Sequence, residues 1–549
     1  MDLFENLSDN QIEAVKTIDE DLEIIACAGA GKTGVVTRRI INILKSNPDI
    51  LPENIVAFTF TEKAAEELKS RVYKYGEAVL GNTKGFANMY IGTIHGFCLK
   101  MLQKYIVQFQ KFTVLDEIKT KLYIEKNYNF CGMPDLGLKI YTETNLFLSV
   151  ISTLNENWFE RDKWDEKTRT AVDKYKDTFY RKNYFDYSLI MQEMLNQLEN
   201  NKDFADIILR KIKYLTVDEY QDTNPIQERL IHFIKQGGCN LCIVGDDDQT
   251  IYQFRGSDPE NILTFRERYG INKYIVLGTD YRSSEAIVDI GKRVIVNNEK
   301  RLSKVMESGK LVKYEEGDTV YREFNECDEE YGFIAKRIKA LHDSGVKYSE
   351  MAVLLRKRKH GPDIAKMFDE YEIPYIIEGV NELFSTAECQ AAKGIFDYLA
   401  GTIGMMELFQ LWKNIDYDLD EKEIAEAIAT LNVIDVKSKK FYGEFVLQKV
   451  YHDFLRRISI VDESNSSEII LYNLGKFSQV INDFETIYYT TIPANKLSSF
   501  CNFLKYTADG YYPEGHIANT YIRPDAVNIM TVHQSKGLEF TAVFIPQMN

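Results

Sequence analysis

The sequence predicts an α/β protein with more than one unit, and three observations lead to this fold class. Between residues 22 and 280, short apolar runs end in small or polar residues and lead into helical patterns, as parallel strands joined by helices do. A second series of the same kind begins near residue 351. The 549 residues are also too many for one core, so roughly three to four domains are expected.

Composition and charge narrow the class of protein. The net charge of −16 argues against a protein that coats nucleic acid indiscriminately, although it is compatible with a local basic groove. The start of the chain has no basic segment followed by an apolar one, and no stretch approaches roughly 18 uninterrupted apolar residues. The eight cysteines lack a framework spacing, and Cys239 and Cys242 flank an apolar run, so buried free thiols are expected. A cytoplasmic protein without a membrane partner is therefore predicted.

The first element, residues 22–33, has the layout of a phosphate-binding loop. The apolar run 22–26 predicts a buried strand, and a helical pattern begins at Lys32 and Thr33. In such a loop the backbone N–H groups face a polyphosphate, Lys32 reaches the outer phosphates, and the Thr33 hydroxyl ligates Mg²⁺. Ala26 stands where the strict pattern has its first glycine. The residues predicted to form the loop are Ala28, Gly29, Ala30 and Gly31.

A helix ahead of the loop carries Gln11, and Ser8 or Asp9 is suited to cap that helix. The Gln11 amide offers the donor and the acceptor that an adenine edge requires. Taken alone, an exposed helical glutamine is the simpler interpretation of this position.

Two further strands are followed by similar polar residues, and we call the residues that directly follow a strand its tip. Phe60 follows the run 54–59, and Thr93 and His95 follow the run 90–92. Open α/β sheets bind ligands at the carboxyl ends of their strands. Two such tips predict a surface for a polyanion, with Thr93 and His95 on phosphates and Phe60 stacked on a base.

A buried strand at 214–217 ends in Asp218 and Glu219, which is the Walker B arrangement. Asp218 is expected to hold Mg²⁺ through water, and Glu219 is expected to polarise the attacking water. After the next strand, 241–244, the Gln249 amide is placed to sense a γ-phosphate. A strand at 274–277 leads to Tyr281, which is suited to stack on adenine, and to Arg282, which is suited to reach the γ-phosphate.

Aromatic and cationic side chains follow Gln249. Tyr252, Phe254 and Arg255 form a cluster suited to stacking on exposed bases. Core aromatics beside a surface arginine are the alternative interpretation.

Two segments are predicted to be helical insertions. Residues 99–183 and 401–519 show helical periodicity with few strand signals, and Pro493 and residues 510–515 are expected in loops. The second α/β series comprises strands at 351–355, 375–377, 527–531 and 542–545 and helices at 362–368 and 387–399.

In this order the motifs resemble those of the superfamily 1A DNA helicases of the UvrD, PcrA and Rep group. The most specific segments are Val-Asp-Glu-Tyr-Gln-Asp-Thr-Asn at 217–224 and Val-Gly-Asp-Asp-Asp-Gln-Thr-Ile-Tyr-Gln-Phe-Arg-Gly at 244–256. The resemblance implies two RecA-like lobes with ATP and Mg²⁺ between them, each lobe with a mostly helical insertion, and 3′→5′ movement on single-stranded DNA. It divides the chain into lobe 1 (1–98 and 184–275) with its insertion (99–183), and lobe 2 (276–400 and 520–549) with its insertion (401–519).

The resemblance also assigns site residues. It implies that nucleotide contacts come from Gln11, Gly29 to Thr33, Asp218, Glu219, Gln249, Tyr281 and Arg282, with Glu539 near the ribose. It implies that DNA contacts come from Phe60, Thr61, Thr93, His95, Tyr252, Phe254, Arg255 and His533.

The chain departs from the family pattern at three places. Phe254 stands where the family usually has Trp, and the segment 384–388, Phe-Ser-Thr-Ala-Glu, lacks an arginine that the family often has there. The family's last motif, which carries a second arginine for the γ-phosphate, is absent from the 549 residues.

Three interpretations follow. The first is an ATP-driven 3′→5′ DNA helicase or translocase that acts on single-stranded or partly duplex DNA in repair, recombination or anti-phage defence. The second is a nucleotide-dependent, DNA-binding regulatory subunit that hydrolyses ATP weakly until a protein partner, for example a nuclease, completes it. The third is that the 549 residues are the N-terminal part of a longer polypeptide.

Overall fold

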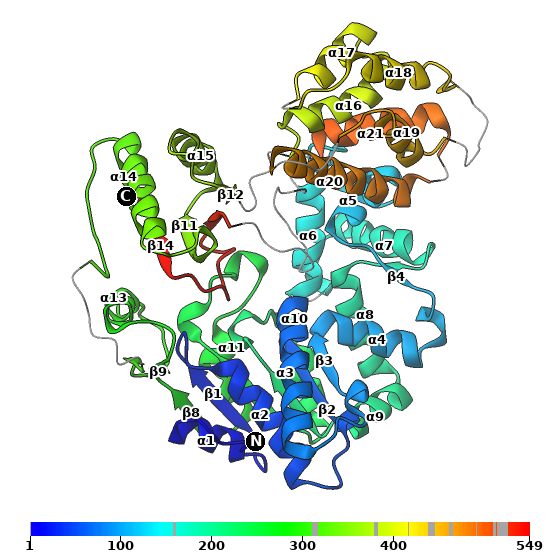
Figure 1. Ribbon diagram of the computed structural model, residues 1–549. Helices are drawn as coiled ribbons and strands as arrows, with labels where there is room; N and C mark the ends of the chain where they lie inside the picture. Colours follow the sequence, from blue (N-terminus) through cyan, green and yellow to red (C-terminus); the bar gives the residue numbers. More distant parts are fainter. Residues whose placement is uncertain are drawn as a thin grey trace. The chain divides into compact units, whose positions relative to one another are not determined.

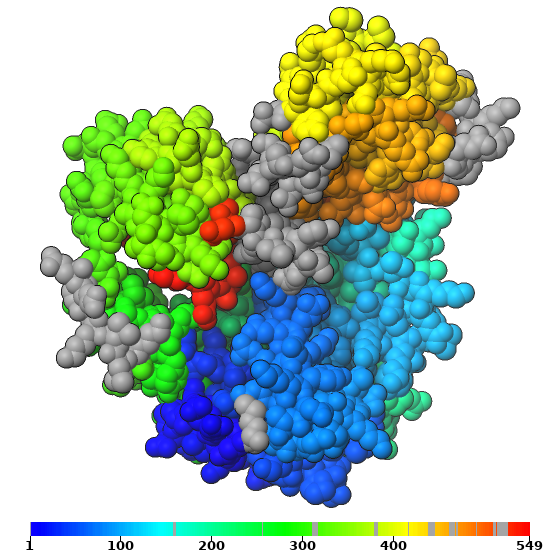
Figure 2. Space-filling view, in the orientation of Figure 1, coloured from blue at the N-terminus to red at the C-terminus, as the bar shows by residue number. Residues whose placement is uncertain are grey.

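A computed structural model describes residues 2–157, 161–309, 317–377, 383–415, 417–437, 445–460, 465–489, 491–508, 512 and 525–548; the remaining residues are grey in Figures 1 and 2. The chain forms two compact units. The first unit comprises Met1–Leu115, Phe130–Leu136 and Leu146–Tyr321, and the second comprises Asp116–Asn129, Gly137–Asn145 and Arg322–Asn549.

The first unit is organised around a six-stranded parallel sheet with the order β3-β2-β6-β7-β1-β8. Figure 1 labels four of these strands, β1, β2, β3 and β8. The strands are β1 (Leu22–Ala26), β2 (Ile55–Thr59), β3 (Tyr90–Thr93), β6 (Tyr214–Val217), β7 (Asn240–Gly245) and β8 (Tyr274–Leu277). Strands β1 and β2 are buried along their whole length, which explains why they appear in the sequence as continuous apolar runs. Because all six strands are parallel, their carboxyl ends lie at one edge of the sheet.

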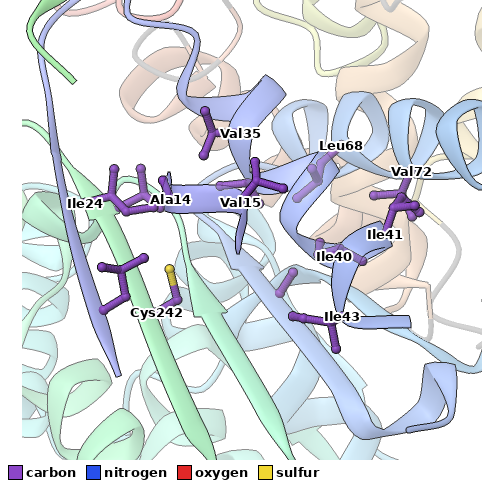
Figure 3. Packing of buried hydrophobic residues seen from close by; sticks show 14 of the residues in the cluster. Ala14, Val15, Ile24, Val35, Ile40, Ile41, Ile43, Leu68, Val72 and Cys242 are labelled. Atoms are coloured by element: carbon purple, nitrogen blue, oxygen red, sulfur yellow. The ribbon is translucent and has the colours of Figure 1, made fainter. Parts of the chain in front are cut away.

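Helices α1, α2 and α3 pack on this sheet through a shared apolar core. Figure 3 shows Val15 of α1, Val35 and Ile40 of α2 and Leu68 of α3 in this cluster. Ser8 caps α1 in a capping box with Gln11, which confirms one of the two predicted caps. The helices of the first unit are α1 (Asp9–Lys16), α2 (Lys32–Ser46), α3 (Glu62–Leu80), α4 (Ile94–Tyr105), α6 (Thr144–Glu156), α7 (Glu166–Tyr180), α8 (Tyr187–Asn200), α9 (Lys202–Lys211), α10 (Pro225–Gln236), α11 (Glu260–Leu263), α12 (Phe265–Tyr269) and α13 (Glu285–Ile295).

Two pairs of short parallel strands complete the first unit. They are β4 (Thr113–Val114) with β5 (Tyr184–Phe185), and β9 (Thr279–Asp280) with β10 (Glu307–Ser308).

The second unit contains a four-stranded parallel sheet with the order β12-β13-β11-β14. Its strands are β11 (Met351–Leu355), β12 (Tyr375–Ile377), β13 (Val527–Thr531) and β14 (Ala542–Phe544). Helices α14 (Cys327–Asp343) and α15 (Gly361–Glu370) pack on these strands. The strands predicted at 351–355, 375–377 and 527–531 are confirmed, and the last predicted strand ends one residue earlier than expected.

The other regular elements among the described residues of the second unit are helices. It contains α5 (Glu117–Lys126), α16 (Ala387–Leu399), α17 (Met405–Lys413), α18 (Glu421–Leu431), α19 (Leu447–Leu455), α20 (Asn465–Tyr488) and α21 (Pro493–Tyr506). Pro493 was expected in a loop but is the first residue of α21, a position where its missing N–H removes no helical hydrogen bond. Apart from residue 512, the expected loop at 510–515 lies outside the described residues.

Helix α5 belongs to the second unit, although the sequence places it within the insertion of the first lobe. Figure 1 shows α5 beside α20. The Lys119 ammonium lies 3.1 Å from Oδ1 of Asp483, and Lys126 donates to the carbonyl of Ile487 at 2.6 Å. These contacts join segments more than 350 residues apart in the sequence, which helical periodicity cannot reveal.

The boundary between the units also differs from the predicted division after residue 275. The contacts assign the chain as far as Tyr321 to the first unit. The physical reason is that β8 pairs with β1, Ile275 lying opposite Ile24, so the residues that follow β8 start from the first sheet. Among the described residues, no helix has the length and apolar character needed to span a membrane.

Candidate active site and nucleic-acid surface

The predicted site residues of the first unit follow the carboxyl ends of its six strands. In the order of the sheet, the tips are those of β3, β2, β6, β7, β1 and β8. The two tips predicted to bind a polyanion are neighbours, since Thr59 of β2 lies opposite Thr93 of β3. The four tips predicted to bind a nucleotide are also contiguous. One edge of one sheet therefore carries both sets of side chains.

The phosphate-binding loop lies between β1 and α2. Gly29 and Gly31 have φ angles of +69° and +75°, in the left-handed region that glycine adopts readily. A Cβ on Gly29 would lie 1.9 Å from Oδ1 of Asp280, so this position also excludes a side chain on steric grounds. Helix α2 begins at Lys32 and directs its N-terminal N–H groups toward the loop.

Gln11 is held against this loop by both ends of its amide. Its Oε1 accepts the N–H of Ser8 at 2.9 Å, and its Nε2 donates to the carbonyl of Ala30 at 3.0 Å. The glutamine thus joins α1 to the loop in this structure, and the contact with adenine stays a prediction. A shallow hollow beside it is lined by Ser8, Asn10, Gln11, Ala30, Leu277, Gly278, Thr279 and Tyr281. This hollow brings together the two side chains predicted to meet adenine.

Asp280, to which the sequence alone gives no role, positions the segment after β8. Its Oδ1 accepts the N–H groups of Arg282 at 2.6 Å and Ser283 at 3.1 Å. The N–H of Tyr281 donates to the carbonyl of Gly29 at 3.0 Å. Tyr281 and Arg282 are therefore fixed to the phosphate-binding loop through the backbone.

The Walker B residues lie beside Lys32, as predicted. The Lys32 ammonium is 3.4 Å from Oε1 of Glu219. Burial acts to lower the pKa of Lys32, but the carboxylates of Glu219, Asp246 and Asp218 outweigh it and raise that pKa. Burial, followed by the charge of Glu219, raises the pKa of Asp218. Three carboxylates thus act on a single ammonium.

Glu219 is held in an uncommon backbone conformation, with φ +52° and ψ +42°. The buried side chain of Gln221 donates to Oε2 of Glu219 at 2.5 Å and accepts the N–H of Asp246 at 3.0 Å. Gln221 therefore joins the tips of β6 and β7. The sequence alone gives Gln221 no role, because an amide inside a motif does not reveal its partners.

The turn after β7 carries Gln249, whose Nε2 donates to Oδ2 of Asp246 at 2.6 Å. Asp246 is 2% exposed, so this contact is buried at its acceptor end. This hydrogen bond fixes the Nε2 end of the Gln249 amide, which is predicted to sense the γ-phosphate.

The aromatic side chains predicted to meet bases gather near this turn. Phe60 stacks on Tyr252 with a centroid distance of 5.4 Å and an angle of 14° between the rings. Phe254 packs edge-on against Tyr252 at 6.1 Å and is 66% exposed. An exposed aromatic face of this kind favours a stacking surface over the alternative of core aromatics. The side chain of Arg255 lies outside the described residues.

Thr61 and Thr93 each cap the helix that follows their strand. Thr61 accepts the N–H of Ala64, and Thr93 accepts the N–H of Gly96. Thr93 also donates its hydroxyl proton to Oε1 of Glu62 at 2.8 Å. An acidic residue is therefore part of the surface predicted to bind phosphate.

His95 lies beside Tyr187, ring edge to ring face at 5.4 Å. Burial lowers its pKa to about 4, so the imidazole is neutral at physiological pH. His95 is therefore suited to hydrogen bonding with a phosphate rather than to ion pairing.

The remaining predicted residues are in the second unit. His533 is half-buried in the turn after β13, and Glu539 is exposed. Phe384, in the segment that lacks the family's arginine, is buried against Phe477 at 6.1 Å. Cys239 and Cys242 of the first unit are buried free thiols, as predicted.

Comparisons with known proteins cover the whole chain. The family model described as the UvrD/REP helicase N-terminal domain matches residues 7–270, and that of the UvrD-like helicase C-terminal domain matches residues 275–403 and 405–549. The two matched segments meet near residue 275, where the sequence predicts the division between the two lobes. The relatives include the ATP-dependent DNA helicase PcrA of Staphylococcus epidermidis, 30% identical over 601 residues that cover 100% of this chain and 78% of the relative. PcrA of Staphylococcus aureus is 29% identical over 606 residues, with the same coverage.

Proposed function

The chain belongs to the UvrD/REP helicase family and is an ATP-hydrolysing DNA helicase, and we propose that it moves 3′→5′ on single-stranded DNA in repair, recombination or anti-phage defence. The direction and the pathways are proposed from the family resemblance. The observation that carries the proposed mechanism is the shared sheet edge, where nucleotide-type tips follow β6, β7, β1 and β8 and DNA-type tips follow β3 and β2.

Binding of the triphosphate is proposed at the N-terminus of α2. The loop N–H groups and the positive end of the helix dipole supply donors and partial charge to the phosphates, and Lys32 supplies a full charge. Tyr281, 43% exposed beside the hollow next to Gln11, presents a face for the adenine.

The residues at this site fit a magnesium ion. Thr33 and Asp218 offer the hard oxygen ligands that Mg²⁺ prefers, and Lys32 faces three carboxylates, one of which Lys304 also contacts. An uncompensated triphosphate would add further negative charge here, which a divalent cation offsets. When bound, Mg²⁺ would polarise the transferred phosphoryl group.

The ion pair between Lys32 and Glu219 suggests how binding of ATP could activate Glu219 for hydrolysis. The Lys32 ammonium lies 3.4 Å from Oε1 of Glu219 and neutralises this carboxylate. Phosphates entering the loop compete for Lys32, which leaves Glu219 to orient and deprotonate water. Gln221 holds the other oxygen of Glu219 at 2.5 Å, so the carboxylate keeps its direction after Lys32 leaves.

Gln249 and Arg282 are proposed to contact the γ-phosphate from the tips of β7 and β8, which lie on either side of β1. Arg282 is placed by the backbone bonds of Asp280, and Gln249 is placed by Asp246. Charge developing on the phosphate strengthens both contacts, as in other phosphoryl transfers.

Single-stranded DNA is proposed to cross the tips of β2 and β3. Bases would stack on the aromatic cluster of Phe60, Tyr252 and Phe254, and phosphates would meet Thr61, Thr93 and His95. His533 and Glu539 are proposed to contribute from the second unit, to DNA and to the ribose respectively.

The test is K32A, compared with K300A as a matched surface lysine, since Lys300 is 77% exposed and pairs with Glu260. We expect K32A to lose ATP hydrolysis stimulated by single-stranded DNA, and K300A to keep it. Displacement of a labelled strand from duplexes with 3′ or 5′ tails measures direction, and preference for the 5′ tail would contradict the proposal. Hydrolysis by the purified chain alone would also separate an autonomous motor from a subunit that a partner must complete.

A further inference from the structure

A fully buried lysine lies among the three carboxylates of the turn after β7. The Lys304 ammonium contacts Asp246, lies 2.6 Å from Oδ1 of Asp247 and lies 2.9 Å from Oδ2 of Asp248. The Lys304 side chain is 0% exposed, and those of the three aspartates are at most 7% exposed. These carboxylates lie within 4.8 Å of one another, so their mutual repulsion requires a cation between them.

Lys304 reaches the turn from a distant segment of the same unit. Residues 279–308 leave the first sheet, form α13 and return to pair β10 beside β9. Near the end of this excursion, Arg301 pairs with Asp248 at 2.8 Å, and the N–H of Leu302 donates to Asp247 at 2.8 Å. Three separate contacts therefore attach the returning chain to the turn.

The same excursion begins with the residues proposed to bind nucleotide. Tyr281 and Arg282 follow β9 directly. The Asp280 carboxylate accepts the N–H of Arg282, and the N–H of Tyr281 donates to the carbonyl of Gly29. The excursion thus carries nucleotide-contacting side chains at its start and Lys304 near its end.

Asp246 connects Lys304 with the side-chain amides of Gln249 and Gln221. Its carboxylate accepts Nε2 of Gln249 at 2.6 Å while it contacts Lys304. Its backbone N–H donates to Gln221, which holds Glu219. A carboxylate in two such contacts has little freedom to rotate.

We propose that Lys304 is a positioning residue for ATP hydrolysis: it holds Asp246 in the orientation that directs Gln249, and so joins the segment of Tyr281 and Arg282 to the turn that senses the γ-phosphate. The inference rests on the proposed role of Gln249. Without the ammonium, three neighbouring carboxylates separate, Asp246 turns away from Gln249, and the amide loses its direction.

The experiment is a double-mutant cycle with Gln249 in the 549-residue chain. The variants are K304M, Q249A, the double variant and K300M, the last as the control on the exposed lysine. Steady-state ATP hydrolysis at saturating single-stranded DNA gives kcat, a fluorescent ATP analogue gives nucleotide affinity, and scanning calorimetry reports folding.

For K304M we expect kcat to fall about 10-fold or more while nucleotide affinity changes less than about 3-fold, because Gln249 acts on the developing charge. In the Q249A background, K304M should cost less than about 2-fold, since residues that act as one unit are not additive. K300M should match the wild-type chain. If K304M acted only through a general loss of stability, the losses of kcat in the two single variants would instead multiply in the double variant.

A K304M chain with kcat within about 2-fold of wild type, or losses that multiply in the double variant, would overturn the inference. If K304M does not fold, K304R decides, because a planar guanidinium cannot replace a point charge among three carboxylates. A loss of kcat in K304R that disappears in the Q249A background supports the inference, and full kcat or an undiminished loss contradicts it. A wild-type chain without DNA-stimulated hydrolysis would count against the proposed function instead.

Discussion

Replacing Gly29 by alanine should disrupt the segment that carries Tyr281 and Arg282. A Cβ at this position would lie 1.9 Å from Oδ1 and 2.6 Å from Cγ of Asp280, and 2.9 Å from Cβ of Arg282. Asp280 is 3% exposed and already bonds two N–H groups through the same Oδ1. The carboxylate must therefore move, and the backbone that it holds must move with it.

The loss of folding stability expected for G29A has two parts. The positive φ of +69° costs an alanine about 1–2 kcal/mol. Loss of one N–H bond to a carboxylate costs about 1.5–3 kcal/mol, and two such bonds are at risk. The total is therefore about 2.5–5 kcal/mol if one bond breaks. Gly270 provides the control, because its φ is +64° and a Cβ there meets nothing within 4 Å, so G270A pays only the backbone cost.

The assays are thermal unfolding and the affinity for a fluorescent ATP analogue. G29A should melt below G270A and bind nucleotide at least about 10-fold more weakly, the equivalent of roughly 1.4 kcal/mol of the lost bonding. G270A should keep the wild-type affinity. If G29A and G270A melt together and bind nucleotide equally, Asp280 does not hold this segment in the way described.

Three further predictions concern the DNA surface. E62Q should tighten binding of single-stranded DNA about 2- to 5-fold at low salt, because it removes a carboxylate bonded to Thr93; E67Q, farther along α3, serves as the control in a fluorescence titration. F60A should weaken that binding about 5- to 150-fold through loss of base stacking, and an equal affinity for F60A and the wild-type chain would remove this side chain from the surface. His95 has a pKa lowered to about 4, so its neutral form stabilises the fold above pH 6.5 and this contribution declines as the pH falls toward 4; melting temperatures of H95Q across that range should show a smaller decline.

Elements whose physical cause is local were predictable from the sequence. The continuous apolar runs of β1 and β2 are buried on both faces, and Ser8 forms the predicted cap with a residue three positions away. The proximity of the phosphate-binding loop to the Walker B residues also followed, because a loop and a strand tip of this kind lie at one edge of a parallel sheet.

Contacts between distant segments were not predictable in this way. Lys304 and Asp246 are 58 residues apart, and no periodicity relates them. The strand order also explains why the contacts extend the first unit beyond the predicted division after residue 275, since β1 lies between β7 and β8 although it precedes both in the chain. Gln11 shows the same limit at short range, because its amide pattern suits an adenine edge and a loop carbonyl equally well.

The strand order also explains how the nucleotide and DNA parts of the edge can communicate. Strand β6 lies between β2 and β7, so the stack of Tyr252 on Phe60 joins the segments after β2 and β7 across the tip that carries Glu219. Neighbouring strands are about 4.8 Å apart, so this bridge spans roughly 10 Å. Only two residues separate Gln249 from Tyr252 along the chain. If the γ-phosphate displaces Gln249 as proposed, we expect the displacement to reach the ring of Tyr252 through the covalent backbone, without a relay of packed side chains. Lys304 contacts Asp246, and Asp246 holds Gln249 at the start of the segment that leads to Tyr252. This anchoring would restrict thermal motion of the turn, so that movement of Gln249 would depend on the bound nucleotide.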